Sequence, residues 1–144
     1  MFTHGKKPKT LAQVNAAKYS FAVIVSRYNE QISEALLRGA LECLKDHSVP
    51  EKNIKVLHVP GAFELPLTAQ KLAETKKYAA VICLGAVIRG ETAHFEYVAG
   101  ECARGLREAA MKTGIPVIFG VLTTNTLAQA KARAKNDRSN KGWE

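Results

Sequence analysis

Several kinds of signal are missing from this sequence of 144 residues, and each absence excludes a class of protein. No apolar run reaches the roughly 18 to 20 residues that a membrane-spanning helix needs, and the first residues lack the apolar stretch of a secretory signal. Cysteine is scarce, because Cys43, Cys83 and Cys102 are widely spaced, odd in number and without a CxxC pair. We therefore expect reduced thiols in a cytosolic protein rather than a disulfide framework or a cysteine metal site.

Motifs of several catalytic chemistries are absent as well. Ser26 and the other serines lack the GxSxG context of a nucleophilic serine, and no histidines or carboxylates stand at the spacing of metal ligands. Neither GxGxxG nor a Walker motif occurs. The sequence thus argues against hydrolases with a covalent intermediate and against metalloenzymes. Repeats and linkers are also missing, so we expect residues 1–144 to form a single domain.

The net charge of +8 is concentrated at the two ends of the chain. Residues 1–10 and 131–144 each carry an excess of +3, which leaves +2 for the central 120 residues. A nucleic-acid-binding protein usually gathers its positive charge on one folded face, among aromatic side chains. We therefore favour solvated ends without a nucleic-acid partner and expect residues 1–17 to be extended or mobile. An anion site near the C-terminal end is the alternative.

Buried-strand patterns alternate with amphipathic-helix patterns along the chain. The strand predictions are Tyr19–Ser26, Ile54–Val59, Ala79–Leu84 and Pro116–Leu122. The helix predictions are Ile32–Leu44 with Asn29 as its N-cap, Phe63–Thr75, Thr92–Met111 closed by Gly114, and Leu127–Ala134. This alternation predicts an α/β fold, in which a four-stranded parallel sheet carries helices on both faces through right-handed crossovers.

Ligands of such sheets bind beyond the carboxyl ends of the strands. We therefore expect four segments to converge there: 27–29, 61–64, 85–94 and 123–125. The loop 85–92 contains two glycines and leads into a helix, so its backbone N–H groups and the helix dipole suit an anion. An ordinary strand-to-helix turn is an equally good interpretation of this loop.

Single residues in these segments carry two interpretations each. His94 lies about 100° around its helix from Phe95 and off the apolar stripe, where the positive helix end favours the neutral imidazole that proton transfer requires. An exposed polar histidine is the alternative. Tyr28 and Phe63 can stack on a planar heterocycle or cover the core, and Glu64 can bind hydroxyl groups or cap its helix.

Pattern alone places Phe119 in the core and both Arg133 and Lys141 on a solvated face. Taken together, however, five segments resemble one family, the lumazine synthases (6,7-dimethyl-8-ribityllumazine synthases) of riboflavin biosynthesis. The segments are 26–29 (SRYN), 59–66 (VPGAFELP), 84–98 (LGAVIRGETAHFEYV), 119–124 (FGVLTT) and 140–142 (NKG). The resemblance covers roughly residues 18 to 142.

The resemblance implies a flavodoxin-like three-layer αβα sandwich and a cytoplasmic transferase without cofactor or metal. Its substrates would be 5-amino-6-(D-ribitylamino)uracil and 3,4-dihydroxy-2-butanone 4-phosphate, and its products the lumazine, phosphate and water. The family implies a homopentamer or multiples of it, up to an icosahedral capsid, with riboflavin synthase as an associated partner and no membrane. It also implies one more helix, which is missing after residue 144.

The resemblance assigns roles residue by residue. His94 would transfer protons. The pyrimidine substrate would contact Tyr28, Ala62, Phe63, Glu64, Ala86, Val87, Ile88 and Phe119. The butanone phosphate would contact Glu91, Thr92, Arg133 and Lys141. Because Phe119 and Arg133 match residues that a neighbouring subunit contributes, the active site would lie at a subunit interface.

The stretch 135–139 departs from the family's pattern. Three rival functions stay open. One is an assembly-forming relative with weak or no catalysis, the second is a flavin- or nucleotide-binding module of flavodoxin shape, and the third is nucleic-acid binding through the basic ends. A turnover assay combined with a measurement of native mass separates the first two from the enzyme, and retention on heparin only at very low salt would count against the third.

Overall fold

The computed structural model describes residues 14–144. The N-terminal prediction for residues 1–13, with their lysine charges, therefore lies outside the described residues. Residues 14–17 have no regular secondary structure. The backbone N–H of Ala16 donates to the His47 carbonyl over 2.8 Å, so this segment begins against the end of the first helix.

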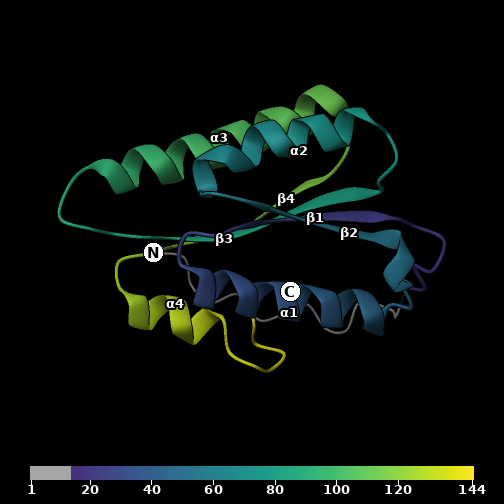
Figure 1. Ribbon diagram of the computed structural model, residues 1–144, viewed down its shortest axis with the longest axis horizontal. Coiled ribbons are helices and arrows are strands. Elements are labelled where there is room, and N and C mark those ends of the chain that lie inside the picture. Colours follow the sequence, from purple (N-terminus) through teal and green to yellow (C-terminus); the bar gives the residue numbers. More distant parts are fainter. Residues whose placement is uncertain (1–13) are drawn as a thin grey trace.

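Four parallel strands form one sheet, and helices cover both of its faces (Figure 1). The elements in chain order are β1 (Phe21–Ser26), α1 (Glu30–Asp46), β2 (Ile54–Val59), α2 (Leu65–Glu74), β3 (Ala80–Ile88), α3 (His94–Thr113), β4 (Val117–Thr124) and α4 (Leu127–Arg133). Short 3₁₀ turns occupy Glu51–Asn53 and Ala62–Glu64. The strand order is β2-β1-β3-β4, which confirms the predicted α/β three-layer sandwich.

The two helical layers are separate, with α2 and α3 on one side of the sheet and α1 and α4 on the other (Figure 1). Strand β1 serves both layers because successive side chains point to opposite faces. Ala22 and Ile24 join the core under α2 and α3, while Val23 and Val25 join the core against α1. All four are completely buried, so the near-continuous apolar run of β1 reflects a strand covered on both faces.

The C-terminal half of β3 differs from the prediction. The strand does not end at Leu84 but continues to Ile88, because its pairing with β4 continues to the register pair Ile88 and Thr124. Four residues that the sequence placed in a loop, Gly85 to Ile88, are therefore part of the sheet. This extension fixes their backbone by ladder hydrogen bonds at the carboxyl edge of the sheet.

Two helix starts also differ from the prediction, since α2 begins at Leu65 rather than Phe63 and α3 at His94 rather than Thr92. Asn29 is the N-cap residue of α1, as predicted, but its backbone is left-handed (φ 59°, ψ 46°) and its side chain makes no capping hydrogen bond. The α3 helix ends, as predicted, at Gly114, which is left-handed with φ 70°. No helix in the described part of the chain is both long enough and apolar enough to cross a membrane.

Candidate functional site

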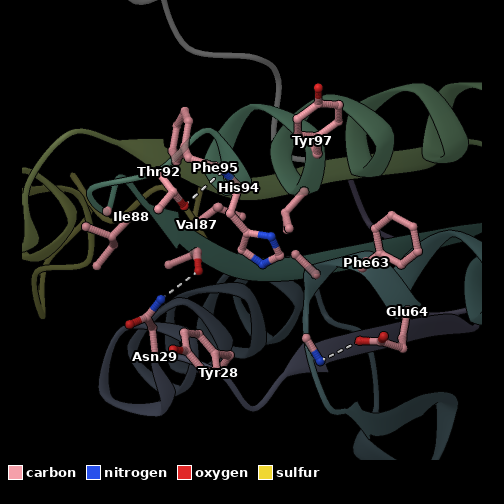
Figure 2. A pocket seen from close by; sticks show the side chains of 15 residues that line it. Tyr28, Asn29, Phe63, Glu64, Val87, Ile88, Thr92, His94, Phe95 and Tyr97 are labelled. Atoms are coloured by element: carbon pink, nitrogen blue, oxygen red, sulfur yellow. Dashed lines mark hydrogen bonds between the residues drawn. The ribbon is translucent and has the colours of Figure 1, made fainter.

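A pocket of about 670 Å³ lies at the carboxyl ends of β1, β2 and β3, beside the first turns of α3. Its lining residues are Tyr28, Asn29, Gly61, Ala62, Phe63, Glu64, Ala86, Val87, Ile88, Gly90, Thr92, His94, Phe95, Tyr97 and Val98. Three of the four predicted segments therefore converge, as Figure 2 shows for their side chains. The fourth segment, 123–125, does not contribute to the lining.

The extended end of β3 forms one wall of this pocket through Ala86, Val87 and Ile88. Asn29 ties the loop after β1 to this wall, because its side-chain amide donates to the Ala86 carbonyl over 2.9 Å. The same loop is tied to the end of β2 by the backbone N–H of Tyr28, which donates to the Pro60 carbonyl over 3.0 Å. Sequence reasoning assigned Asn29 to helix capping, and its contact across the strands is not visible in a local pattern.

Three aromatic rings at the pocket stay largely in water. Tyr28 is 75% exposed, Phe63 59% and Tyr97 70%, and all three belong to the lining. Rings that cover a core are buried, so the core-covering interpretation of Tyr28 and Phe63 is wrong. Gathered exposed aromatic surface is typical of a site that binds a ring or a partner.

Tyr97 was not among the sequence candidates. It follows His94 by three positions on α3, and side chains at this spacing share one helix face. That spacing is a signal that could have identified Tyr97 once His94 was chosen.

Glu64 caps the 3₁₀ turn before α2. Its carboxylate accepts the backbone N–H of Gly61 over 2.8 Å, so the capping interpretation holds for this turn, whereas α2 itself has no side-chain cap. The side chain is exposed and also belongs to the pocket lining. A single hydrogen bond leaves most of the acceptor capacity of a carboxylate free for hydroxyl groups.

His94 is exposed at the first position of α3 and lies inside the lining (Figure 2). Its backbone N–H points to the Thr92 hydroxyl over 3.4 Å. Helix α3 starts without a side-chain cap at Ala93, and the first N–H groups of a helix have no partner within the helix. Gly90 and Thr92 also line the pocket, whereas Glu91 does not. The arrangement can receive an anion close to an imidazole.

Besides Glu91, three sequence candidates are absent from the pocket lining in the single chain: Phe119, Arg133 and Lys141. Phe119 is 44% exposed on the edge strand β4, so the expectation of a core position is wrong. Arg133 and Lys141 are exposed as their pattern predicts, and the Lys141 backbone N–H donates to the Arg133 carbonyl over 2.8 Å. Their roles from a neighbouring subunit stay predictions.

Charge and burial act differently on the titratable groups around this region. The hydrogen bond from Arg89 to Glu96, on the first turn of α3, holds the pKa of that carboxyl below its usual value. Burial raises the pKa of the Cys102 thiol to about 11 and that of Cys83 further. In residues 14–144, no three histidine, cysteine or acidic side chains group in a way that could hold a metal ion.

One comparison with known proteins bears on this geometry. The family model for 6,7-dimethyl-8-ribityllumazine synthase matches residues 18–144, which is nearly the whole chain and includes every residue of the pocket.

Proposed function

Because this chain belongs to the 6,7-dimethyl-8-ribityllumazine synthase family and hence to riboflavin biosynthesis, we propose that it catalyses the condensation that forms the lumazine. The substrates are 5-amino-6-(D-ribitylamino)uracil and 3,4-dihydroxy-2-butanone 4-phosphate, and the products are 6,7-dimethyl-8-ribityllumazine, phosphate and water. The observation that carries the proposal is a single pocket that combines exposed aromatic rings, a strand edge, an uncapped helix start and His94.

The pyrimidine lies against the Tyr28 ring and along the strand wall of Ala86, Val87 and Ile88. Backbone groups of a strand end offer fixed donors and acceptors to the edge of a heterocycle. The ribityl chain runs past Ala62 and Phe63 toward the Glu64 carboxylate, whose free lone pairs accept its hydroxyl protons.

The phosphate of the second substrate lies at the loop that begins with Gly90 and ends at α3, where Gly90, Thr92 and His94 line the pocket and a helix N-terminus favours an anion. The Glu91 side chain would repel this anion, so its contribution comes from the backbone. This placement holds the reactive ketone close to His94 and to the amino group of the pyrimidine.

The chemistry needs proximity and proton transfer. The 5-amino group attacks the ketone, and loss of water gives an imine. Phosphate then leaves C4 as a proton leaves C3, and the resulting enol takes a proton at C4 to become the C3 ketone. The ribitylamino nitrogen attacks this ketone and closes the ring with loss of a second water. His94 moves these protons, for which a positioned acid or base contributes about 10²–10⁴-fold. Holding two reactants together contributes several kcal/mol more, of the order that effective molarities provide.

We place the complete site between two copies of the chain in a homopentamer or a multiple of it. Phe119, Arg133 and Lys141 of one copy complete the pocket of the next, where Arg133 and Lys141 neutralise the phosphate. The exposed ring of Phe119 on an edge strand supports this arrangement. The three cysteines are free, which supports a cytoplasmic location, and riboflavin synthase, which uses the product, is the proposed associated enzyme.

The test mixes the purified protein with both substrates and follows lumazine absorbance and fluorescence, while native mass is measured on the same sample. We expect product and a mass of five chains or a multiple of five. An assembly without turnover would mean that the protein is an inactive shell-forming relative of the enzyme. Tight flavin binding without product would mean that the protein is a flavin-binding module.

A further inference from the structure

Arg89 is the first residue after β3, and it precedes the loop that runs from Gly90 to the start of α3. Its backbone N–H donates to the Thr124 carbonyl over 2.9 Å. Its side-chain Nε donates to Asn125 Oδ1 over 3.0 Å. Both partners belong to the end of β4 and the turn that follows it, so Arg89 anchors the beginning of the loop to the edge strand.

The same guanidinium also holds the far end of the loop. One terminal nitrogen donates to the Glu96 carboxylate in the first turn of α3, and the guanidinium carbon lies 4.3 Å from the centre of the Phe95 ring. We call Arg89 with its partners Asn125, Glu96 and Phe95 the Arg89 clamp. Because Phe95 directly follows His94 in the chain, this clamp reaches the residue next to the one that carries the imidazole. Phe95 lines the pocket, whereas Arg89, Glu96 and Asn125 do not.

A planar guanidinium suits this arrangement, because its donors point in fixed directions while its face stacks on an aromatic ring. The Arg89 side chain is 41% exposed, and single ion pairs at such exposure contribute little. The geometric effect is larger, since one rigid group fixes the first residue of a short loop relative to the helix turn in which the loop ends.

We propose that Arg89 is a positioning residue that sets the distance between the phosphate-binding backbone of residues 90–93 and the imidazole of His94. The proposal rests on the proposed function of this pocket. Arg89 acts through Glu96, Phe95 and Asn125 rather than on the substrate: its guanidinium binds Glu96 and Asn125, and Arg89 does not line the pocket.

The test measures steady-state kinetics for Arg89→Ala with each substrate varied in turn. We expect KM for the butanone phosphate to rise about tenfold, because a small displacement of the phosphate-binding backbone groups weakens binding steeply. KM for the pyrimidine should change less than about twofold. Inhibition by inorganic phosphate, used as a competitive inhibitor, should weaken by a similar factor. Circular dichroism checks that the variant is folded.

Two further variants separate positioning from direct contact with phosphate. Glu96→Ala and Asn125→Ala each remove one partner of the clamp and leave the Arg89 charge in place. A positioning role predicts that both raise KM for the butanone phosphate in the same direction as Arg89→Ala. If Arg89 instead bound the phosphate directly, both variants would keep the wild-type KM for the butanone phosphate. That result would overturn the proposal.

Arg104→Ala is the matched control. Arg104 lies on α3, as do Phe95 and Glu96, and pairs with Glu101 one turn away over 3.8 Å. It does not line the pocket. The variant should leave both KM values unchanged. An Arg89→Ala enzyme with unchanged KM for the butanone phosphate would overturn the positioning role.

A second readout keeps this test independent of the proposed function. If the wild-type protein makes no lumazine, the proposed function fails, while hydrogen exchange still tests the clamp. We expect amides in peptides spanning residues 90–98 to exchange faster in Arg89→Ala than in the wild type or in Arg104→Ala. Equal exchange in all three proteins would overturn the clamp itself.

Discussion

At the scale of single residues, exposure distinguishes side chains that build the fold from side chains that face a ligand. Tyr28 and Tyr97 keep at least 70% of their surface in water, whereas Ile24 and Val25 of the adjacent strand keep none. Apolar surface of that size is unfavourable in water. The proposed pyrimidine and ribityl chain would cover it, which links the exposed rings to the chemistry of the pocket.

The His94 imidazole carries the first prediction. His94→Ala should lower kcat by about 10²-fold, the low end of acid–base catalysis, because proximity of the two substrates persists without the imidazole. KM for either substrate should change little. His58→Ala is the control, since His58 binds Glu34 over 2.8 Å outside the pocket lining. A kcat equal to that of the wild type would remove His94 from the mechanism.

The Glu96 carboxyl carries a second prediction, on pH. Arg89 lowers the pKa of this group in the folded protein. The pair therefore stabilises the fold above the ordinary carboxyl pKa, and this contribution is lost as the pH falls through the lowered value. Carboxyl chemical shifts followed by NMR should show the Glu96 pKa rising toward its usual value in Arg89→Ala. An identical pKa in both proteins would contradict the clamp.

At the scale of elements, the packing of α2 on α3 depends on one close approach. A methyl group built at Gly105 would lie 2.7 Å from Pro66 Cβ, closer than atoms pack. Gly100, on the same helix, has open space around the same position. The two glycines thus provide a matched pair, in which one serves helix packing and the other only weakens α3.

The Gly105 and Gly100 pair gives a third prediction. Gly105→Ala should destabilise the protein by about 1–3 kcal/mol, because overpacking pushes the two helices apart. Gly100→Ala should stabilise it by about 0.5–1 kcal/mol, the intrinsic gain of alanine over glycine in a helix. Urea denaturation measures both changes. Equal stabilisation in the two variants would mean that α2 and α3 do not pack as closely as described.

A second element-scale feature is the attachment of the chain end to α1. Asn140 is 3% exposed, and its amide donates to the carbonyls of Ala35 and Lys135 over 2.9 and 2.8 Å. Its side-chain oxygen accepts the Gly142 N–H over 2.7 Å. This buried amide, packed beside Gly39, fixes the irregular segment that carries Lys141, together with the backbone hydrogen bond from Lys141 to Arg133.

At the scale of the whole molecule, β4 is the last strand of the sheet that residues 14–144 form, so no strand of that range pairs with its outer side. Ile118 and Phe119 are 47% and 44% exposed there, on opposite faces of the strand. Exposed apolar edge strands invite pairing or packing with another chain. The proposed assembly makes use of this edge, since Phe119 of one copy would face the pocket of the next.

The shared site gives a fourth prediction. Arg133→Ala should raise KM for the butanone phosphate more than His94→Ala does, because it removes a charge from the phosphate. Refolding His94→Ala and Arg133→Ala chains together should restore part of the turnover, since some sites then combine an intact His94 with an intact Arg133. Each variant refolded alone is the control. If the mixture is no more active than its components, the site is complete within one chain.

Local pattern was enough for much of this protein. The bounds of the strand Ile54–Val59 are those predicted, and the left-handed Gly114 ends α3 as expected. The exposed position of His94 also followed from its place off the apolar stripe. These features depend on residues within one or two helical turns or on a short apolar run, so the sequence contains what is needed to predict them.

Long-range contacts decided the rest. Strand β3 extends to Ile88 because β4 lies beside it. The Asn29 side chain binds the Ala86 carbonyl instead of capping α1, and Phe119 is exposed because its strand is the last of the described sheet. By itself the sequence determined which segments are strands and helices and which loops follow the strands. Only the tertiary structure decided where β3 stops and which side chains meet in the pocket, because these depend on neighbours that are distant along the chain.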